Sequence, residues 1–158
     1  MSLSRKFHYV NLMSTQNGLN RAEIWANLKL SSRIPIINAS SQQLSQVWLN
    51  LLNNAIEAMS GKLKNSKPGS IKARNIHIKS NLKKGEVVIR VSDSSPGISE
   101  EDLDKIFCPF YTRKKTMGLG VGLSICHNIV KDHDGSITAK NSPDGGAVFT
   151  IKRRLNNG

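Results

Sequence analysis

Apolar and polar positions along the chain predict two main helices set among several strands. The clearer helix begins at Ser40 or Ser41, either of which can cap it, and runs to about Met59, with apolar residues at every third or fourth position. Gly61 follows as a terminator. A second helical period covers residues 121–132. From residues 11 to 30 the apolar positions fit a helical period only loosely.

Short apolar runs between turn residues predict the strands. They are expected at residues 7–10, 34–37, 75–82, 86–91, 136–140 and 147–152. Residues 83–85 form the expected hairpin turn between the third and fourth of these strands, and residues 62–70 are expected to be a loop. The weakly patterned stretch 92–117 is long enough for a binding loop or lid. This order predicts an α+β fold, a two-layer α/β sandwich with helices on one face of a mostly antiparallel mixed sheet.

The composition indicates one globular domain with a high positive charge. The chain has 158 residues, a net charge of +12 and no apolar run long enough to cross a bilayer. Such charge suits nucleic acid, an anionic membrane or an acidic protein. The basic residues are dispersed in the sequence and aromatics for base stacking are few, so most of them are interpreted as solvated and no nucleic acid is expected. Cys108 and Cys126 are predicted to be buried thiols in a reducing compartment.

A glycine run precedes the second helix. Gly118, Gly120 and Gly122 alternate with Leu119 and Val121 just where the helical period begins. Glycine allows close backbone approach to a ligand, and a helix start leaves unpaired N–H groups at its positive end. The run therefore predicts an anion site, most plausibly for phosphate, although a flexible loop would show the same pattern.

Amide side chains line one stripe of the first helix. Asn50, Asn54 and Glu57 are spaced four and three residues apart. A solvated polar face explains this spacing, but such faces normally carry Glu, Lys and Arg in place of amides. An amide oxygen can also ligate Mg²⁺ together with water and phosphate.

A carboxylate closes the strand expected at residues 86–91. Asp93 is followed by turn residues that end at Gly97. Asp93 could be a turn residue, or it could accept a hydrogen bond from an exocyclic amine while Gly97 lets the backbone pass beside a ring. Both interpretations stay open on local grounds.

Taken together, these stretches resemble the ATP-binding catalytic domain of sensor histidine kinases, in the superfamily shared with gyrase, MutL and the heat-shock chaperone ATPases. The resemblance covers residues 6–153 in the family's order and spacing. Its five segments are the N box at 46–58, the first glycine box at 93–98, the F box at 106–114, the second glycine box at 118–123 and the closing hairpin at 143–149.

The resemblance implies a role for each box. Asn54 would ligate Mg²⁺, and Asn50 would support that site from the position where ATP-hydrolysing relatives carry a glutamate base. Lys114 or Arg113 on the lid could neutralise γ-phosphate charge, so Asn50, Asn54 and Lys114 form the catalytic set. The residues assigned to the nucleotide are Asn50, Asn54, Glu57, Asp93, Gly97, Ile98, Thr112, Arg113, Lys114, Gly118, Leu119, Gly120, Val121, Gly122 and Leu123. Phe107 and Phe110 would anchor the lid to the core.

The sequence departs from the family pattern in two places. Ser95 stands where the first glycine box usually has glycine, so the adenine pocket could be altered. No histidine has the acidic residue and proline that follow the family's phosphoacceptor, so none is assigned to catalysis; the four histidines are His8, His77, His127 and His133. The resemblance therefore implies the catalytic part of a longer kinase, with residues 1–5 as a linker, 6–154 as the domain and 155–158 as a tail.

The implied partners follow from that interpretation. They are ATP with Mg²⁺, a histidine-bearing dimerisation domain of a homodimeric parent kinase, and a response regulator downstream. The domain is expected to be cytoplasmic, with the membrane attachment of its parent left open. A protein-serine kinase, a clamp-type ATPase of the same superfamily and a basic nucleic-acid-binding module remain as alternatives.

Overall fold

The computed structural model describes residues 2–15, 18–60, 74–111 and 120–155. Its elements in order are β1 (Ser2–Thr15), β2 (Gly18–Ser31), α1 (Ser41–Ser60), β3 (Arg74–Lys83), β4 (Glu86–Asp93), α2 (Glu100–Leu103), α3 (Gly122–Asp132), β5 (Gly135–Asn141) and β6 (Ala147–Arg154). No described helix combines the length and the apolar composition that a membrane span requires.

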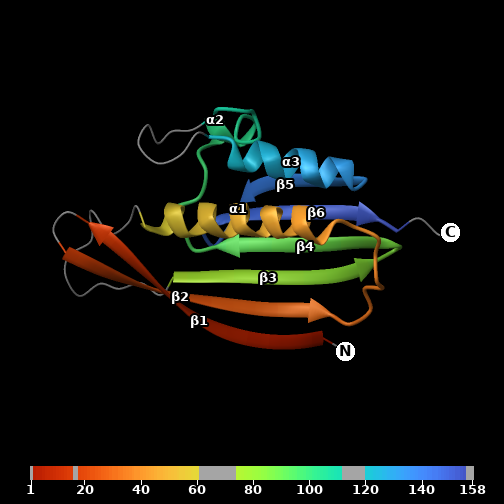
Figure 1. Ribbon diagram of the computed structural model, residues 1–158, viewed down its shortest axis with the longest axis horizontal. Helices are drawn as coiled ribbons and strands as arrows, with labels where there is room; N and C mark the ends of the chain where they lie inside the picture. Colours follow the sequence, from red (N-terminus) through yellow and green to blue (C-terminus); the bar gives the residue numbers. More distant parts are fainter. Residues whose placement is uncertain (1, 16–17, 61–73, 112–119, 156–158) are drawn as a thin grey trace.

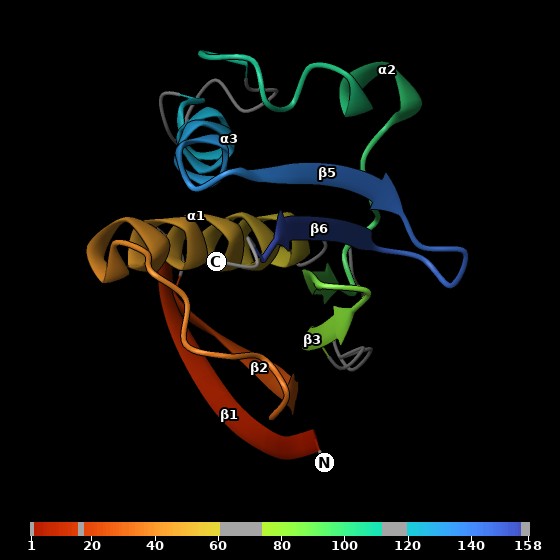
Figure 2. The ribbon, with the colours of Figure 1, turned by 90° about the vertical axis from the view of Figure 1, so that its right-hand side faces the viewer.

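A six-stranded sheet forms one layer, in the order β1-β2-β3-β4-β6-β5. Among the described strands, β2 and β3 pair in parallel and the other neighbouring pairs are antiparallel. Figures 1 and 2 show α1 and α3 together on one side of this sheet. The predicted α+β sandwich is therefore confirmed.

The N-terminal third of the chain is a long β-hairpin, which differs from the prediction. β1 and β2 pair along their whole lengths, from Ser2 opposite Ser31 to Thr15 opposite Gly18. The loose helical period at 11–30 does not correspond to a helix, because apolar residues also occupy every second position in the second half of that stretch, as a strand with one buried face requires. The residues that alternate in this way are Ala22, Ile24, Ala26, Leu28 and Leu30.

Two neighbouring predictions change with this hairpin. The expected strand at 7–10 lies within β1 at the edge of the sheet, and residues 2–5, which had been assigned to a linker, lie in the same strand. The expected strand at 34–37 is wrong, since this segment has no regular structure and Ile36 is fully exposed.

The core lies between the sheet and the two long helices. It contains apolar side chains from β2, β3, β4, β5 and β6 as well as from α1 and α3. Its largest fully buried members are Phe149, Ile24, Leu51, Met59, Val47 and Cys126. Burial raises the pKa of the Cys126 thiol to about 11. The expectation for Cys108 is wrong, because this thiol is exposed.

The two long helices are joined at one end by a histidine. Ser40 caps α1, since its hydroxyl accepts the backbone N–H of Gln43. The backbone N–H of Ser40 donates in turn to Nε2 of His133, and Nδ1 of the same ring lies 2.8 Å from the carbonyl oxygen of Ile129 in α3. His133 thus has a structural position.

The predicted loop at 62–70 lies outside the described residues. The turn at 83–85 is confirmed, with positive φ angles of 51° at Lys84 and 73° at Gly85. Within the long stretch 92–117 the structure adds α2, a single short turn of helix that was not predicted.

Candidate functional site

Three of the predicted boxes meet at one end of the molecule. Figure 1 shows the C-terminal half of α1, the end of β4 and the start of α3 on the same side. These elements carry the amide stripe, Asp93 and the second half of the glycine run. Residues 112–114, 118 and 119, which the sequence assigned to the lid and the glycine run, lie outside the described residues.

Asn50 connects the amide stripe to the glycine run. Its side-chain N–H donates to the carbonyl oxygen of Gly122, the first residue of α3, at 3.1 Å. A side chain 72 positions away in the sequence therefore sets the distance between the N box and the second glycine box. Because its amide is used as a donor here, Asn50 stabilises the helix start and supplies no base.

Asn54 and Glu57 follow on the same stripe towards the end of α1. Both are half-buried, whereas Asn53 on the neighbouring face is exposed. The stripe therefore differs from the solvated polar face that was the alternative interpretation. Among the described residues no cluster of three or more His, Cys, Asp or Glu side chains could hold a metal. A divalent ion at this place would need amide, water and phosphate oxygens, which is the donor set that Mg²⁺ prefers.

Asp93 is held firmly at the end of β4. Its side chain is buried, with 8% of its surface exposed. Oδ1 accepts the backbone N–H groups of Ser95 at 2.9 Å and of Ala147 at 3.2 Å. One carboxylate oxygen is thus fixed by the protein, which sets the direction of the other.

The loop after Asp93 is closed by two further contacts. Ser95 Oγ accepts the backbone N–H of Gly97, so the residue that departs from the family pattern stabilises the turn. Asn141 pairs with the backbone of Ile98 through both of its amide groups, at 2.7 and 2.6 Å. Gly97 has a φ of 91°, and a Cβ there would lie 2.6 Å from the Asn141 side chain. Glycine is required at this position on both grounds.

The β5–β6 hairpin supports the same loop from behind. A Cβ at Gly146 would lie only 1.9 Å from the carbonyl oxygen of Asp93. The hairpin belongs to the resemblance as its closing segment, without an expected role in the site. Asn141 and Gly146 are thus positioning residues that sequence reasoning missed, since an asparagine or glycine near a turn looks like ordinary turn chemistry.

Tyr111 and Gly120 flank the residues expected to form the lid. Gly120, at a φ of 67°, packs so closely on Tyr111 that a Cβ would lie 2.9 Å from the Tyr111 carbonyl oxygen. The Tyr111 hydroxyl donates to the buried carboxylate of Asp102, whose other oxygen accepts from Ser99. Residues 111 and 120, which flank the expected lid, are therefore side by side.

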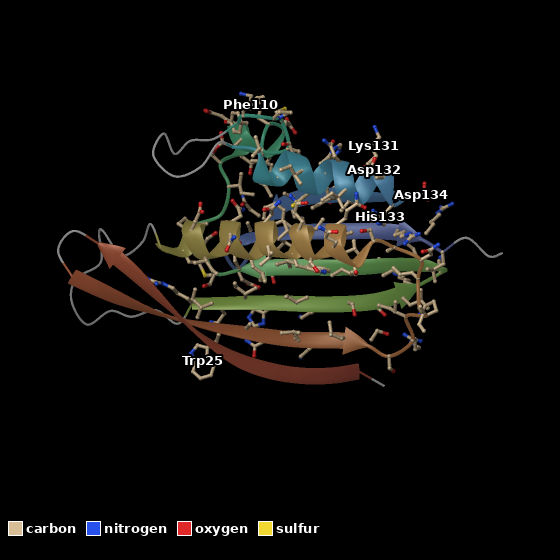
Figure 3. All side chains as sticks on the ribbon, in the orientation of Figure 1. Trp25, Phe110, Lys131, Asp132, His133 and Asp134 are labelled. Atoms are coloured by element: carbon tan, nitrogen blue, oxygen red, sulfur yellow. The ribbon has the colours of Figure 1, made fainter. Side chains whose placement is uncertain are left out.

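Only one of the two phenylalanines expected to anchor the lid packs on the core. Phe107 packs on the core, with its ring edge-on to Phe149 at a centroid distance of 6.4 Å. Phe110 is 76% exposed and points away from the core, as Figure 3 shows, and it has a positive φ of 64°. The prediction for Phe110 as a core anchor is wrong.

Comparison with known proteins matches this arrangement to one family. Residues 39–157 match the family described as histidine kinase-, DNA gyrase B- and HSP90-like ATPases. The chain belongs to this ATPase family. The nucleotide-free catalytic domain of histidine kinase ThkA is 33% identical to it, with a TM-score of 0.58 over 81% of this chain and 70% of that one. Histidine kinase AdeS of Acinetobacter baumannii is 27% identical, with a TM-score of 0.63 over 85% of this chain and 55% of that one.

Curated relatives indicate the same branch of the ATPase family. Sensor histidine kinase TmoS of Ectopseudomonas mendocina is 36% identical over 79% of this chain and 12% of its own length. Sensor histidine kinase ZraS of Escherichia coli K12 is 33% identical over 91% of this chain and 28% of its own length. This ATPase-family chain therefore corresponds to the ATP-binding catalytic part of a histidine kinase and spans less than a third of these curated relatives.

Proposed function

We propose that residues 6–154 bind Mg·ATP and transfer its γ-phosphoryl group to a histidine on a separate dimerisation domain. That histidine would then pass the phosphoryl group to a response regulator. In the intact kinase this domain would work in the cytoplasm, in a homodimer. The observation that carries the proposal is the hydrogen bond from Asn50 to Gly122, because it joins the amide stripe to the glycine-rich start of α3.

The residues around that hydrogen bond fit a nucleotide. The start of α3 presents backbone N–H groups without intrahelical partners, which suits phosphate oxygens. Asn54, one turn along α1 from Asn50, offers an amide oxygen, and a bound Mg²⁺ would supply charge neutralisation between the phosphates. Asp93 would accept the adenine amine through the carboxylate oxygen that Ser95 and Ala147 leave available.

The chemistry needs little more from this chain. Phosphoryl transfer depends mainly on positioning and on neutralisation of charge. The bond from the acceptor imidazole nitrogen to the γ-phosphorus forms as the bond to the β–γ bridging oxygen breaks, and ADP leaves with that electron pair. Arg113 or Lys114 would meet the negative charge on the transferred group.

Asn50 favours transfer over hydrolysis. An amide cannot take a proton from water, and this amide already donates to Gly122. The family's ATP-hydrolysing members carry a glutamate base at the corresponding place. The clamp-type ATPase alternative is accordingly not favoured.

The assignment of Asn54 is tested by Asn54→Ala. We expect Mg-dependent ATP binding to be lost, with Kd raised by at least about 100-fold, because the neutral oxygen ligand is removed. The helix itself should not be weakened, since Ala is a better helix former than Asn. Calorimetric titration with Mg·ATP measures the effect, and circular dichroism checks the fold.

Asn53→Ala is the matched control for this experiment. It makes the same change one residue earlier, on the exposed side of α1, and should leave ATP affinity unchanged. An Asn54→Ala chain that binds Mg·ATP as tightly as the Asn53→Ala chain would refute the proposed Mg²⁺ ligand.

A further inference from the structure

Basic residues that are scattered in the sequence gather on one face of the sheet. This face, here called the basic face, is the side of the sheet opposite α1 and α3 (Figure 2). Its cationic side chains all lie on the same side by strand register and are all exposed. They are Lys29, Lys79, Lys83, Arg90, Lys140, Lys152 and Arg154. Glu86 is the one acidic residue among the described side chains of this face.

The densest part of the basic face is a row of like charges. Lys29 is the register partner of Lys79, and Lys79 is the register partner of Arg90. Cations directly opposite each other on neighbouring strands destabilise a sheet. The pKa of His77 is lowered, mainly by burial and to a smaller extent by the positive charges of Lys79 and Lys29. Folding alone therefore does not account for the row.

The same row borders a hollow in the sheet surface. The hollow has a volume of about 740 Å³ and reaches from the end of β2 across β3 to β4. Five cationic side chains line it and no acidic one does; they are Lys29, Arg33, Lys79, Lys83 and Arg90. Such a hollow has the charge and the size for a phosphate-bearing headgroup.

We propose that the basic face docks on an anionic phospholipid bilayer, with headgroup phosphates in the hollow. Charge complementarity carries the proposal, because seven exposed cations on one open sheet face match a surface of fixed negative charge. Trp25 lies on the same face of β2 and is 40% exposed, pointing away from the helices (Figure 3). Tryptophan rings are typical of the headgroup level of a membrane.

The face fits a bilayer better than a nucleic acid. Binding of single strands uses several stacking aromatics, and Trp25 is the one Phe, Tyr or Trp among the described side chains of this face. Reading of duplex DNA needs a helix or a ribbon that enters a groove, whereas these cations are spread over an open sheet. Docking through this face would leave the proposed nucleotide site, on the other side of the sheet, open to solution.

Vesicle co-sedimentation of the whole chain tests the proposal. We expect the chain to bind vesicles of phosphatidylcholine mixed with phosphatidylglycerol and not to bind vesicles of phosphatidylcholine alone. Added salt should release the bound chain. In the double variant Lys79→Gln, Arg90→Gln, the partition coefficient of the chain onto anionic vesicles should fall about 25-fold, because each lost positive charge lowers it about fivefold. The pair Lys29→Gln, Lys152→Gln gives an independent variant of the same face with the same expectation.

The control pair is Lys105→Gln, Lys131→Gln, which removes the same charge from exposed positions outside the sheet. It should leave vesicle binding within about twofold of the parent. Equal losses in the two pairs, no preference for anionic vesicles, or complete displacement from vesicles by duplex DNA at equal phosphate concentration would each overturn the proposal. Mg·ATP affinity should be the same in all these variants, so this result is independent of the proposed kinase function.

Discussion

Gly146→Ala should be the most destabilising single-methyl change in the described site. A Cβ at this position would lie 1.9 Å from the carbonyl oxygen of Asp93, which is backbone and can move only with β4. The φ of 91° adds strain for any residue with a side chain. We expect a loss of about 3–5 kcal/mol in the free energy of unfolding. ATP binding should weaken as well, because the same overlap displaces Asp93.

Gly145→Ala is the matched control for Gly146→Ala. Its φ is 90°, nearly the same as that of Gly146, yet a Cβ there would meet nothing within 4 Å. Only the backbone strain remains, so we expect a loss of about 1 kcal/mol. Urea denaturation of both variants measures the difference. Similar losses in the two variants would show that the close contact with Asp93 does not exist in solution.

Asp93→Asn should reduce ATP affinity by at least about 100-fold while the domain stays folded. Oδ1 of Asp93 accepts two backbone N–H groups, from Ser95 and Ala147. In the variant the amide oxygen must take that position, so the amide nitrogen replaces the other oxygen. The group proposed to accept the adenine amine thus becomes a donor. Guanine carries an acceptor at that ring position, so the preference for ATP over GTP should also be lost.

Calorimetric titration with both nucleotides measures this change. Asp144→Asn provides the control, since that carboxylate is exposed in the β5–β6 hairpin and should be neutral to binding. If the Asp93→Asn chain binds ATP as tightly as the parent, Asp93 is a turn residue and has no part in reading the base.

Local patterns predicted the central elements of this fold well. The boundaries of α1 and α3 were right within a few residues, because each combines a clear helical period with a glycine or serine signal at an end. The β3–β4 hairpin followed from its tight turn. The hairpin of β1 and β2 was not predicted, because the apolar positions at 11–30 also fit a helical period loosely.

The site was predictable as a set of boxes but not as a geometry. Asn50, Asp93 and the start of α3 were named from their residues, and α1, β4 and α3 bring them to one end of the molecule. The residues that hold them in place were not predicted, because each acts through a contact between distant segments. These contacts are Asn141 with Ile98 and Gly146 with Asp93. The basic face was also missed, since strand alternation and register gather residues that the sequence separates.

Transfer of labelled phosphate is the most direct test of the central claim. The chain is mixed with γ-labelled ATP, Mg²⁺ and a histidine-bearing helical hairpin from its parent protein, and the labelled products are treated with acid and with base. We expect label on the hairpin that is lost in acid and survives base, as phosphohistidine does, and none on this chain alone. A hairpin with its histidine changed to glutamine should stay unlabelled. Acid-stable label on serine, or acid-labile label on the isolated chain, would contradict the account.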